Sequence, residues 1–433
     1  MTATSHADFR SDEAFALAQD AQDPLRGFRE QFAIPSLEGL GPTPAGSSLP
    51  TVYLTGNSLG AMPARVPDLL RQELEDWARL GVEGHLHGRD PWLPYHEQFR
   101  APLGRLVGAT EREVVAMNSL TVNLHLLMAS FYRPTPDRFS IIIEDTAFPS
   151  DSYAVASQAS FHAFDPQRAV VRLRPRVGES VLRTEDVVGV IERERPALVM
   201  LGAVNYLTGQ WFDMAAITAA GHRAGAAVGW DLAHAAGNVP MRLHDWGVDF
   251  AAWCSYKYLN AGPGAIAGAF VHEKHLARTD LPRLCGWWGN DPATRFRMGP
   301  DFVPVASADA WSLSNPPIFS LTPLKASLDL FDRATMPALR AKSVRLTSYM
   351  ESLLTPRRAK GLEILTPADP SARGCQLSRV VPGMSREIQR RLLERHVVCD
   401  FREPNVVRAA PAPLYNSYHD VWRFVRELNH LMP

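Results

Sequence analysis

The chain has 433 residues, a formal net charge of -1 at pH 7 and 46% hydrophobic residues. This balance predicts a large buried core and no basic surface for nucleic acid or an anionic membrane. No apolar run approaches the roughly 18–20 residues of a membrane span, and the acidic N-terminus lacks the apolar core of an export signal. The four cysteines are far apart and form no CxxC pair, which favours reduced thiols in the cytoplasm over a disulfide framework or a zinc site.

Short apolar segments alternate with helical patterns through the middle of the chain. This alternation indicates βαβ units and a mostly parallel sheet in an α/β domain. Apolar runs predict strands, and capped periodic runs predict helices. Asp213 is the expected N-cap of the helix at 213–225. The predicted strands are 139–145, 197–206, 226–231, 249–255 and 265–273, and the predicted helices are 185–196 and 213–225.

The pattern of predicted strands and helices changes after about residue 316. A long helical stretch at 321–354 leads to short mixed elements and a final helix, which indicates a smaller α+β domain. The first 60 residues are rich in proline and glycine, and we expect them to be irregular and to pack on the body of the protein. We therefore predict an N-terminal segment at 1–60, a large domain at 61–320 and a small domain at 321–433.

Two charged residues stand where predicted strands end. Asp231 ends the strand at 226–231, and Lys257 follows the strand at 249–255. The carboxyl ends of strands are where open α/β sheets bind ligands. A lysine there can form a Schiff base with an aldehyde cofactor, and an aspartate can keep a pyridine nitrogen protonated, which together indicate pyridoxal 5′-phosphate (PLP). An ordinary ion pair at the edge of the core is the alternative interpretation.

A phosphate-binding site and a ring platform can also be read from the sequence. Ser119 and Thr121 precede an apolar helical run, and hydroxyls with free N–H groups at a helix start bind anions. Phe148, Ser150 and Asp151 follow the strand at 139–145, where an aromatic ring can stack on a pyridine. A plain helix cap and mere packing of Phe148 are the alternatives.

Several motifs resemble the kynureninase family. They include "NSLTVNLH", "FPSD", "VNYLTGQ", "WDLAHAAGNVP", "HDWGVDFAAWCSYKYLNAGPGAIAGAFVHEKH", "SNPPI", "RGCQLS" and "RAAPAPLYNS", and the resemblance runs from about Tyr53 to the C-terminus. It implies a fold-type-I PLP-dependent enzyme, with an aspartate-aminotransferase-like large domain and a smaller α+β C-terminal domain.

The resemblance also implies roles for individual residues. Lys257 matches the Schiff-base lysine, Asp231 the partner of the pyridine nitrogen, and Tyr256 a tyrosine that touches the phosphate and transfers a proton; these three are the candidate catalytic residues. The remaining candidate cofactor-binding residues are Leu120, Thr121, Phe148, Pro149, Ser150, Asp151, Gly202, His234, Trp287 and Asn315. The last two match positions that reach the site from the other subunit of a homodimer. Gly202 stands where the family has a cofactor-contacting serine, and the sequence at 91–99 is also unusual.

The substrate positions come from the same resemblance. Arg408 matches the arginine that holds the substrate carboxylate, and the apolar residues around it favour this interpretation over a surface arginine. His85 matches a position near the substrate ring, with His87 as a rival. Ser314 and Asn315 match a pair associated with a preference for a hydroxylated ring, although they can also simply shape a turn before Pro316.

The implied reaction is hydrolytic Cβ–Cγ cleavage of kynurenine or 3-hydroxykynurenine to an anthranilate and alanine, in tryptophan degradation, NAD biosynthesis or a related biosynthetic pathway. We expect no metal, no nucleic-acid partner and no membrane partner. Two other functions stay open. A cysteine desulfurase requires a thiol near the cofactor, for which Cys375 is the candidate, and a non-enzymatic PLP-binding regulator is expected to carry an added DNA-binding module, of which the sequence shows no sign.

Overall fold

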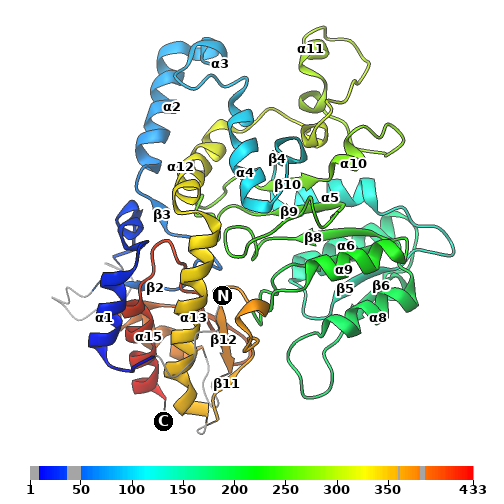
Figure 1. Cartoon of the computed structure of the whole chain (residues 1–433). Helices are drawn as coiled ribbons and strands as arrows, with labels where there is room; N and C mark the ends of the chain where they lie inside the picture. The colour runs from blue at the N-terminus through cyan, green and yellow to red at the C-terminus, as the bar shows by residue number, and fades with distance from the viewer. Residues whose placement is uncertain (1–8, 37–49, 359–360, 381–385, 433) are drawn as a thin grey trace.

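The computed structural model describes residues 9–36, 50–358, 361–380 and 386–432 (Figure 1). Its largest sheet has seven strands, in the order β4 (Val114–Ala116), β10 (Gly268–Val271), β9 (Phe250–Trp253), β8 (Ala227–Asp231), β7 (Leu198–Gly202), β5 (Ile141–Glu144) and β6 (Val170–Leu173). Neighbouring strands from β9 to β6 are parallel, whereas β10 is antiparallel to both β9 and β4. The prediction of an α/β fold with a mostly parallel sheet is confirmed.

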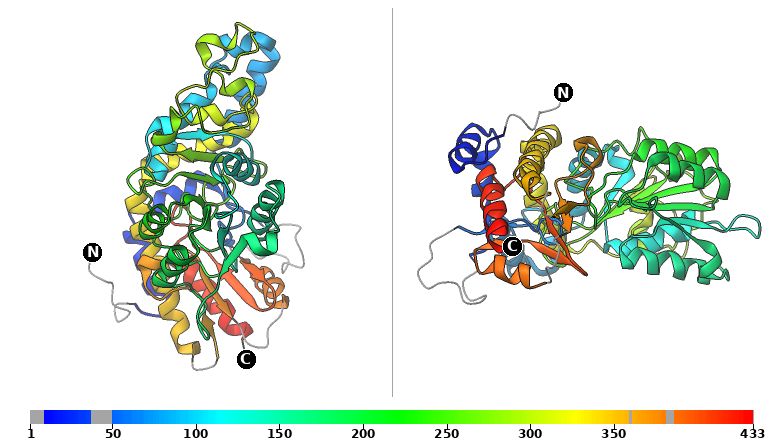
Figure 2. Two further views of the ribbon diagram at one scale, coloured as in Figure 1. Left: turned by 90° about the vertical axis from the view of Figure 1, so that its right-hand side faces the viewer. Right: turned by 90° about the horizontal axis from the view of Figure 1, so that it is seen from below.

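Helices cover both faces of this sheet (Figure 2, right). In β7, Leu198 and Met200 pack into a core with α5 (Leu120–Phe131) and α6 (Pro149–Phe161). The alternate residues Val199 and Leu201 pack into a second core with α8 (Thr184–Glu194) and α9 (Met214–Arg223). Strands buried on both faces are apolar along their whole length, which explains why these segments are continuous hydrophobic runs.

The predicted helix at 213–225 begins as the sequence indicates, because the Asp213 side chain accepts a hydrogen bond from Ala216 N at 3.0 Å. The long helical stretch at 321–354 is instead two helices, α12 (Ile318–Ala334) and α13 (Met336–Arg358). The break is at Thr335, whose φ is 65°, a conformation that a β-branched residue adopts only under tertiary constraint. Further helices between β3 (Met62–Pro63) and α12 are α2 (Val66–Leu80), α3 (Gly84–His87), α4 (Arg100–Val107), α7 (Pro166–Ala169), α10 (Glu273–Leu276) and α11 (Pro292–Arg295).

A second, antiparallel sheet follows α13, with the order β11 (Glu363–Ile364), β12 (Leu377–Val380), β15 (Val406–Ala409) and β14 (Asp400–Arg402). Residues of α13, α14 (Glu387–Leu393) and α15 (Tyr418–Leu431) form a hydrophobic core with this sheet. This α+β arrangement agrees with the character expected of the C-terminal part. The boundaries near residues 60 and 320 stay predictions.

The N-terminal segment contains more regular structure than its composition indicates. Helix α1 (Glu13–Gln22) lies beside α15 (Figure 1), and Ala16 enters the core around α13 and α15. Strand β2 (Val52–Tyr53) pairs in parallel with β13 (Val397–Val398), and β1 (Phe32–Ala33) pairs with β3 (Met62–Pro63). Residues 1–8 and 37–49 of this segment lie outside the described residues. Within the described ranges, no helix combines the length and apolar character needed to cross a membrane.

Candidate active site

A pocket of about 170 Å³ opens at the carboxyl ends of β5, β7 and β8, next to the turn after β9. Three segments distant in the sequence reach it because parallel strands end at the same edge of a sheet. Its lining residues are Ser119, Leu120, Thr121, Glu144, Phe148, Ser150, Asp151, Gly202, Val204, Tyr206, Asp231, Ala233, His234, Tyr256 and Lys257.

Lys257 lies in the turn that follows β9, with its amine inside the pocket. Its Nζ is 3.1 Å from Nε2 of His234 and 5.7 Å from the centroid of the Phe148 ring. Burial, and secondarily the nearby Lys257 charge, hold the pKa of His234 well below its ordinary value. His234 is therefore a neutral imidazole whose Nε2 accepts a hydrogen bond from the Lys257 amine.

Two carboxyl groups in the lining of the pocket face each other. Asp231 ends β8, Asp151 lies in the first turn of α6, and their side chains share a hydrogen bond. Burial is the main cause that raises the pKa of both, and the negative charge of Asp231 raises that of Asp151 further. The shared hydrogen bond raises the pKa of Asp151 and lowers that of Asp231, so Asp151 is the donor of the pair and Asp231 the acceptor.

A third carboxyl group, Glu144, lies at the end of β5. It is 3% exposed, and its two oxygens are 3.2 and 3.3 Å from the backbone N–H of Gly202. Burial is the main cause that raises its pKa to about 7. Three acids and one amine consequently share this small pocket, so the acids cannot all be ionised together.

Two helix N-termini contribute residues to the lining of the pocket. Helix α5 begins at Leu120, and its N-cap residue Ser119 makes no side-chain capping bond. Helix α6 begins at Pro149, again without a side-chain cap, and the hydroxyls of Thr121 and Ser150 lie 2.8 Å apart. Unsatisfied N–H groups and helix dipoles at two adjoining starts form a site for an anionic group.

Aromatic rings complete the walls. Phe148 is 44% exposed, a high value for a ring in a pocket, and it packs edge-on against Tyr206 with centroids 5.3 Å apart. Burial raises the pKa of Tyr256, so its phenol stays protonated at neutral pH. The site thus offers a free aromatic face, a proton donor, an amine and an anion site.

Comparison with known proteins identifies the family. Residues 339–428 match the model described as the kynureninase C-terminal domain. A kynureninase from Myxococcus xanthus is 57% identical over 422 residues, with 97% of each chain covered. A kynureninase from Salinispora tropica is 58% identical over 419 residues, with 95% of each chain covered.

The chain belongs to the kynureninase family.

Solved structures of low sequence identity show the same fold. A cysteine desulfurase from Escherichia coli has a TM-score of 0.74 at 19% identity, covering 94% of this chain and 99% of that one. Another, from Thermococcus onnurineus, has a TM-score of 0.72 at 17% identity, covering 88% of this chain and 94% of that one. The expectation of a fold-type-I architecture is confirmed.

The structure gathers most of the residues that the family resemblance selects. Pro149 begins α6 beside the pocket without lining it. Arg408, on β15, is 1% exposed and reaches the pocket wall indirectly, since its Nη1 donates to the carbonyl oxygen of Tyr206 at 2.5 Å. Its guanidinium carbon is 5.8 Å from the Tyr206 ring centroid.

Other predicted residues lie apart from the pocket within one chain. His85 is in α3, where its Nδ1 contacts Val82 O at 2.9 Å. His87 is exposed in the same helix and faces Glu83. Trp287, Ser314 and Asn315 are exposed on the segments around α11 and before α12. Their roles stay predictions, which a single chain does not test.

Sequence reasoning missed Glu144 and Tyr206 in the pocket, along with Val204 and Ala233. Glu144 had a visible signal, because it is a charged residue at the end of a buried strand, as Asp231 is. Tyr206 had a weaker one, since it ends the predicted strand at 197–206 and stands in the quoted motif "VNYLTGQ".

The cysteines bear on the desulfurase alternative. Cys375 is fully buried, and burial raises its pKa to about 12, so it is not a reactive thiolate. Among the described residues that line the pocket, none is a cysteine. The kynureninase relatives are also far closer in sequence than the desulfurases, so the alternative gains no support.

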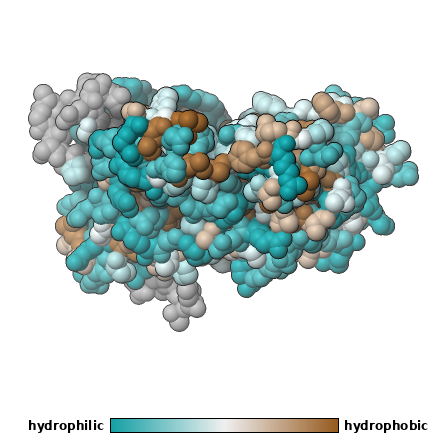
Figure 3. All heavy atoms as spheres, turned by 90° about the horizontal axis from the view of Figure 1, so that it is seen from above, coloured by the Kyte–Doolittle hydropathy of each residue, from teal (hydrophilic) through white to brown (hydrophobic). Residues whose placement is uncertain are grey.

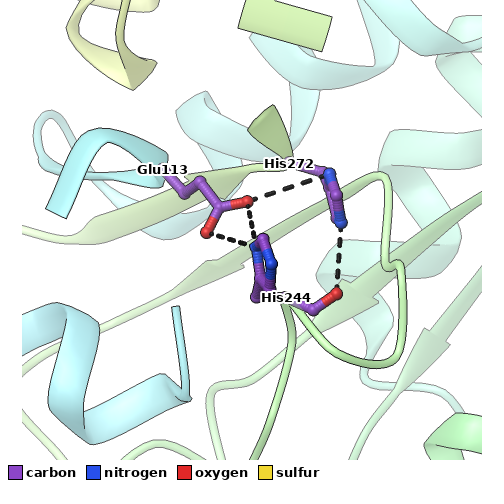
Figure 4. A group of neighbouring side chains, drawn as sticks. All are labelled: Glu113, His244 and His272. Atoms are coloured by element: carbon purple, nitrogen blue, oxygen red, sulfur yellow. Dashed lines mark hydrogen bonds and ion pairs between the residues drawn. The ribbon is translucent and has the colours of Figure 1, made fainter. Parts of the chain in front are cut away.

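Glu113, His244 and His272 form a group of possible metal ligands outside the pocket (Figure 4), with ligand atoms all within 4.8 Å of one another. Glu113 Oε1 already contacts His244 Nδ1 at 2.9 Å and accepts from Glu273 N at 2.8 Å. The two imidazoles stack, with planes 10° apart and centroids 5.1 Å apart. The in-plane lone pairs of such rings do not converge on one point. We therefore interpret the group as a hydrogen-bonded link among the turn before β4, the loop that holds His244 and the residue after β10.

Proposed function

We propose that this enzyme hydrolyses the Cβ–Cγ bond of L-kynurenine or 3-hydroxy-L-kynurenine, releasing anthranilate or 3-hydroxyanthranilate and L-alanine, with PLP as its cofactor. One observation carries the proposal: Lys257, Asp231 and two uncapped helix N-termini surround a single pocket in a chain 57% identical to a kynureninase.

The residues of the pocket fit PLP at each of its groups. The starts of α5 and α6, with the Thr121 and Ser150 hydroxyls, suit a phosphate. Asp231, which accepts from Asp151, suits a protonated ring nitrogen, and the free face of Phe148 suits the ring itself. Bound PLP supplies an aldehyde carbon that reacts with amines and a protonated pyridine ring that withdraws electron density.

The protein's own side chains then have definite tasks. Lys257 holds the cofactor and, once displaced by the substrate amine, removes the proton from the substrate Cα. Neutral His234 keeps the amine oriented through its 3.1 Å contact. Water adds to the γ-carbonyl carbon, the Cβ–Cγ bond breaks, and protonated Tyr256 donates a proton to Cβ, which becomes the methyl group of alanine. Lys257 returns its proton to Cα, and the proton released by the added water restores the Tyr256 phenol.

Arg408 is the proposed tether for the substrate carboxylate. A planar guanidinium binds a carboxylate through two parallel N–H bonds. Burial lowers the pKa of Arg408 to about 10, so it still carries its charge at neutral pH. Its contact with Tyr206 connects it to the wall beside Phe148 and Lys257.

We also propose a two-fold symmetric homodimer in which Trp287 and Asn315 complete the partner's site. Both α3 and α11 stand at the top of the molecule in Figure 1, and hydrophobic residues gather on the face seen from above (Figure 3). Leu86, Trp287, Phe296 and Met298 are 59%, 40%, 57% and 75% exposed in a single chain. Large exposed apolar patches mark interaction surfaces, and a second copy is the partner we propose.

Subunit mixing tests this assembly. Lys257→Ala and Trp287→Ala chains, each inactive alone, are expected to recover part of the activity when they exchange into mixed dimers. Proven exchange without recovery would count against shared sites. We further propose a cytoplasmic location, which the four free cysteines support.

The function itself is tested by product analysis. The purified enzyme with PLP is incubated with kynurenine or with cysteine, and alanine, anthranilate and sulfide are measured. We expect alanine and anthranilate in equal amounts from kynurenine. Sulfide release from cysteine as the faster reaction would overturn the proposal in favour of a desulfurase.

A further inference from the structure

Three charged side chains form a cluster on one face of the C-terminal sheet, joined to the pocket lining by the contact of Arg408 with Tyr206. Asp400 on β14 is the registered neighbour of Arg408 on β15, and Arg402 lies two residues further along β14, so all three share a face. Asp400 Oδ2 contacts Nη2 of Arg408 and lies 3.2 Å from Nη2 of Arg402. One carboxylate therefore holds two guanidinium groups.

The donors of Arg408 are only partly used. Its Nη1 donates to Tyr206 O at 2.5 Å and its Nη2 to Asp400, whereas the buried Nε has no partner in the described residues. Nε and Nη2 form the side-on fork with which arginine binds a carboxylate. Asp400 thus occupies one arm of that fork and leaves the other unsatisfied.

The charge of the cluster is also incomplete. Two guanidinium groups face one carboxylate, an excess of one positive charge where Arg408 and Asp400 side chains are only 1% and 11% exposed. Both arginines contribute to the low pKa of His234, after burial and Lys257, which places them within electrostatic reach of the pocket. One further carboxylate would balance the cluster and satisfy the free Nε.

We propose that Asp400 acts as a stand-in for the substrate carboxylate, holding the Arg408 fork in the free enzyme and moving to Arg402 when substrate binds. Asp400 and Arg402 are positioning residues, because they act on the substrate through Arg408. The inference rests on the proposed role of Arg408 as the substrate tether. Arg402, with a side chain 38% exposed, has the freedom to follow Asp400.

The exchange predicts opposite effects from its two partners. Asp400→Asn removes the competitor for the fork, so carboxylate ligands are expected to bind more tightly. Arg402→Gln removes the alternative partner and leaves Asp400 on Arg408, so the same ligands are expected to bind more weakly. Each change is expected to be about tenfold, the order of one charged hydrogen bond. A merely structural role would weaken binding in both variants.

The test compares L-alanine with L-alaninamide, which lacks the carboxylate, by titration calorimetry on the PLP-loaded enzyme, with KM and kcat for kynurenine measured alongside. The ratio of the two dissociation constants gives the contribution of the ligand carboxylate to binding. We expect the preference for L-alanine to rise in Asp400→Asn, to fall in Arg402→Gln and to return in Arg402→Lys. Arg386→Gln is the matched control, because this 69% exposed arginine pairs with Glu403 rather than Asp400.

The outcomes separate the two claims. If Arg408→Lys leaves the ratio unchanged, Arg408 is not the tether and the proposed site itself is wrong. If Arg408→Lys lowers the ratio but Asp400→Asn and Arg402→Gln shift it in the same direction, or not at all, the exchange is overturned while the tether stands. Should Asp400→Asn fail to fold, Arg402→Gln decides alone, because unchanged or tighter binding contradicts the exchange.

Discussion

The carboxyl group of Glu144 accepts a bifurcated hydrogen bond from the backbone N–H of Gly202, at 3.2 and 3.3 Å, inside the proposed cofactor pocket. The two residues end neighbouring segments of the sheet, on β5 and β7. No cation is among the causes that shift the pKa of Glu144, and burial raises it from 4.5 to about 7.

This pKa predicts how stability depends on pH. Between about pH 4.5 and 7 the folded state binds a proton at Glu144 that the unfolded state releases, so the free energy of unfolding falls as the pH rises through this window. At about 1.4 kcal/mol per pKa unit the loss is about 3 kcal/mol. The Glu144→Gln variant should not show this loss. In urea unfolding it should therefore have a higher free energy of unfolding than the parent at pH 8 but not at pH 4.5. The same difference in unfolding free energy at both pH values would contradict the raised pKa of Glu144.

Gly202 itself gives a second prediction. A β-carbon added there would lie 2.9 Å from Glu144 Oε1, the movable end of a side chain, so a serine fits after a small shift. Its hydroxyl would add a hydrogen-bonding group to the pocket. Gly202→Ser is expected to bind PLP about two- to tenfold more tightly, the range of one hydrogen bond, by equilibrium titration of the cofactor. Gly189→Ser, at an open position, is the control, and weaker binding in Gly202→Ser alone would refute the prediction.

The link between Glu113 and His244 predicts a different pH response. The hydrogen bond from Glu113 is the main cause that raises the pKa of His244 above 6.5. The stabilisation is fully present below that ordinary value and is lost as the pH rises through the folded-state pKa. His244→Gln should therefore lower the melting temperature more at pH 6 than at pH 9. A decrease in melting temperature that is the same at both pH values would show that the positive charge of His244 does not contribute to stability.

How far the sequence could lead is seen in particular residues. Asp231 and Lys257 were predictable because charged residues at the ends of apolar strands stand out. Ser119 and Thr121 were predictable because their hydroxyls stand before an apolar helical run, and Ser150 because it follows a strand at the same edge of the sheet, whereas Leu120 came only from the family resemblance. Glu144 was missed because its strand was interpreted only as packing. The antiparallel direction of β10 and the break at Thr335 depend on contacts distant in the sequence, which local patterns do not encode. Helix α1 was hidden by the surrounding proline and glycine.

The substrate ring gives a further prediction. Ser314 and Asn315 are exposed in one chain and free to face the partner's site. Polar groups placed to bind an aryl hydroxyl are left unpaired without it, at roughly 1–3 kcal/mol per group. We expect kcat/KM to favour 3-hydroxykynurenine over kynurenine, and Ser314→Gly with Asn315→Thr to narrow the preference. Equal use of both substrates by the parent enzyme would remove the basis for this assignment.

Labelled water tests the central claim most directly. In oxygen-18 water, mass spectrometry of the products from unlabelled kynurenine should show one heavy oxygen in the new carboxylate of anthranilate and none in alanine, because water adds only to the γ-carbonyl carbon. Lys257→Ala should give almost no product, since it lacks both the cofactor tether and the base. Unlabelled anthranilate, or full turnover by Lys257→Ala, would contradict hydrolytic cleavage at this site.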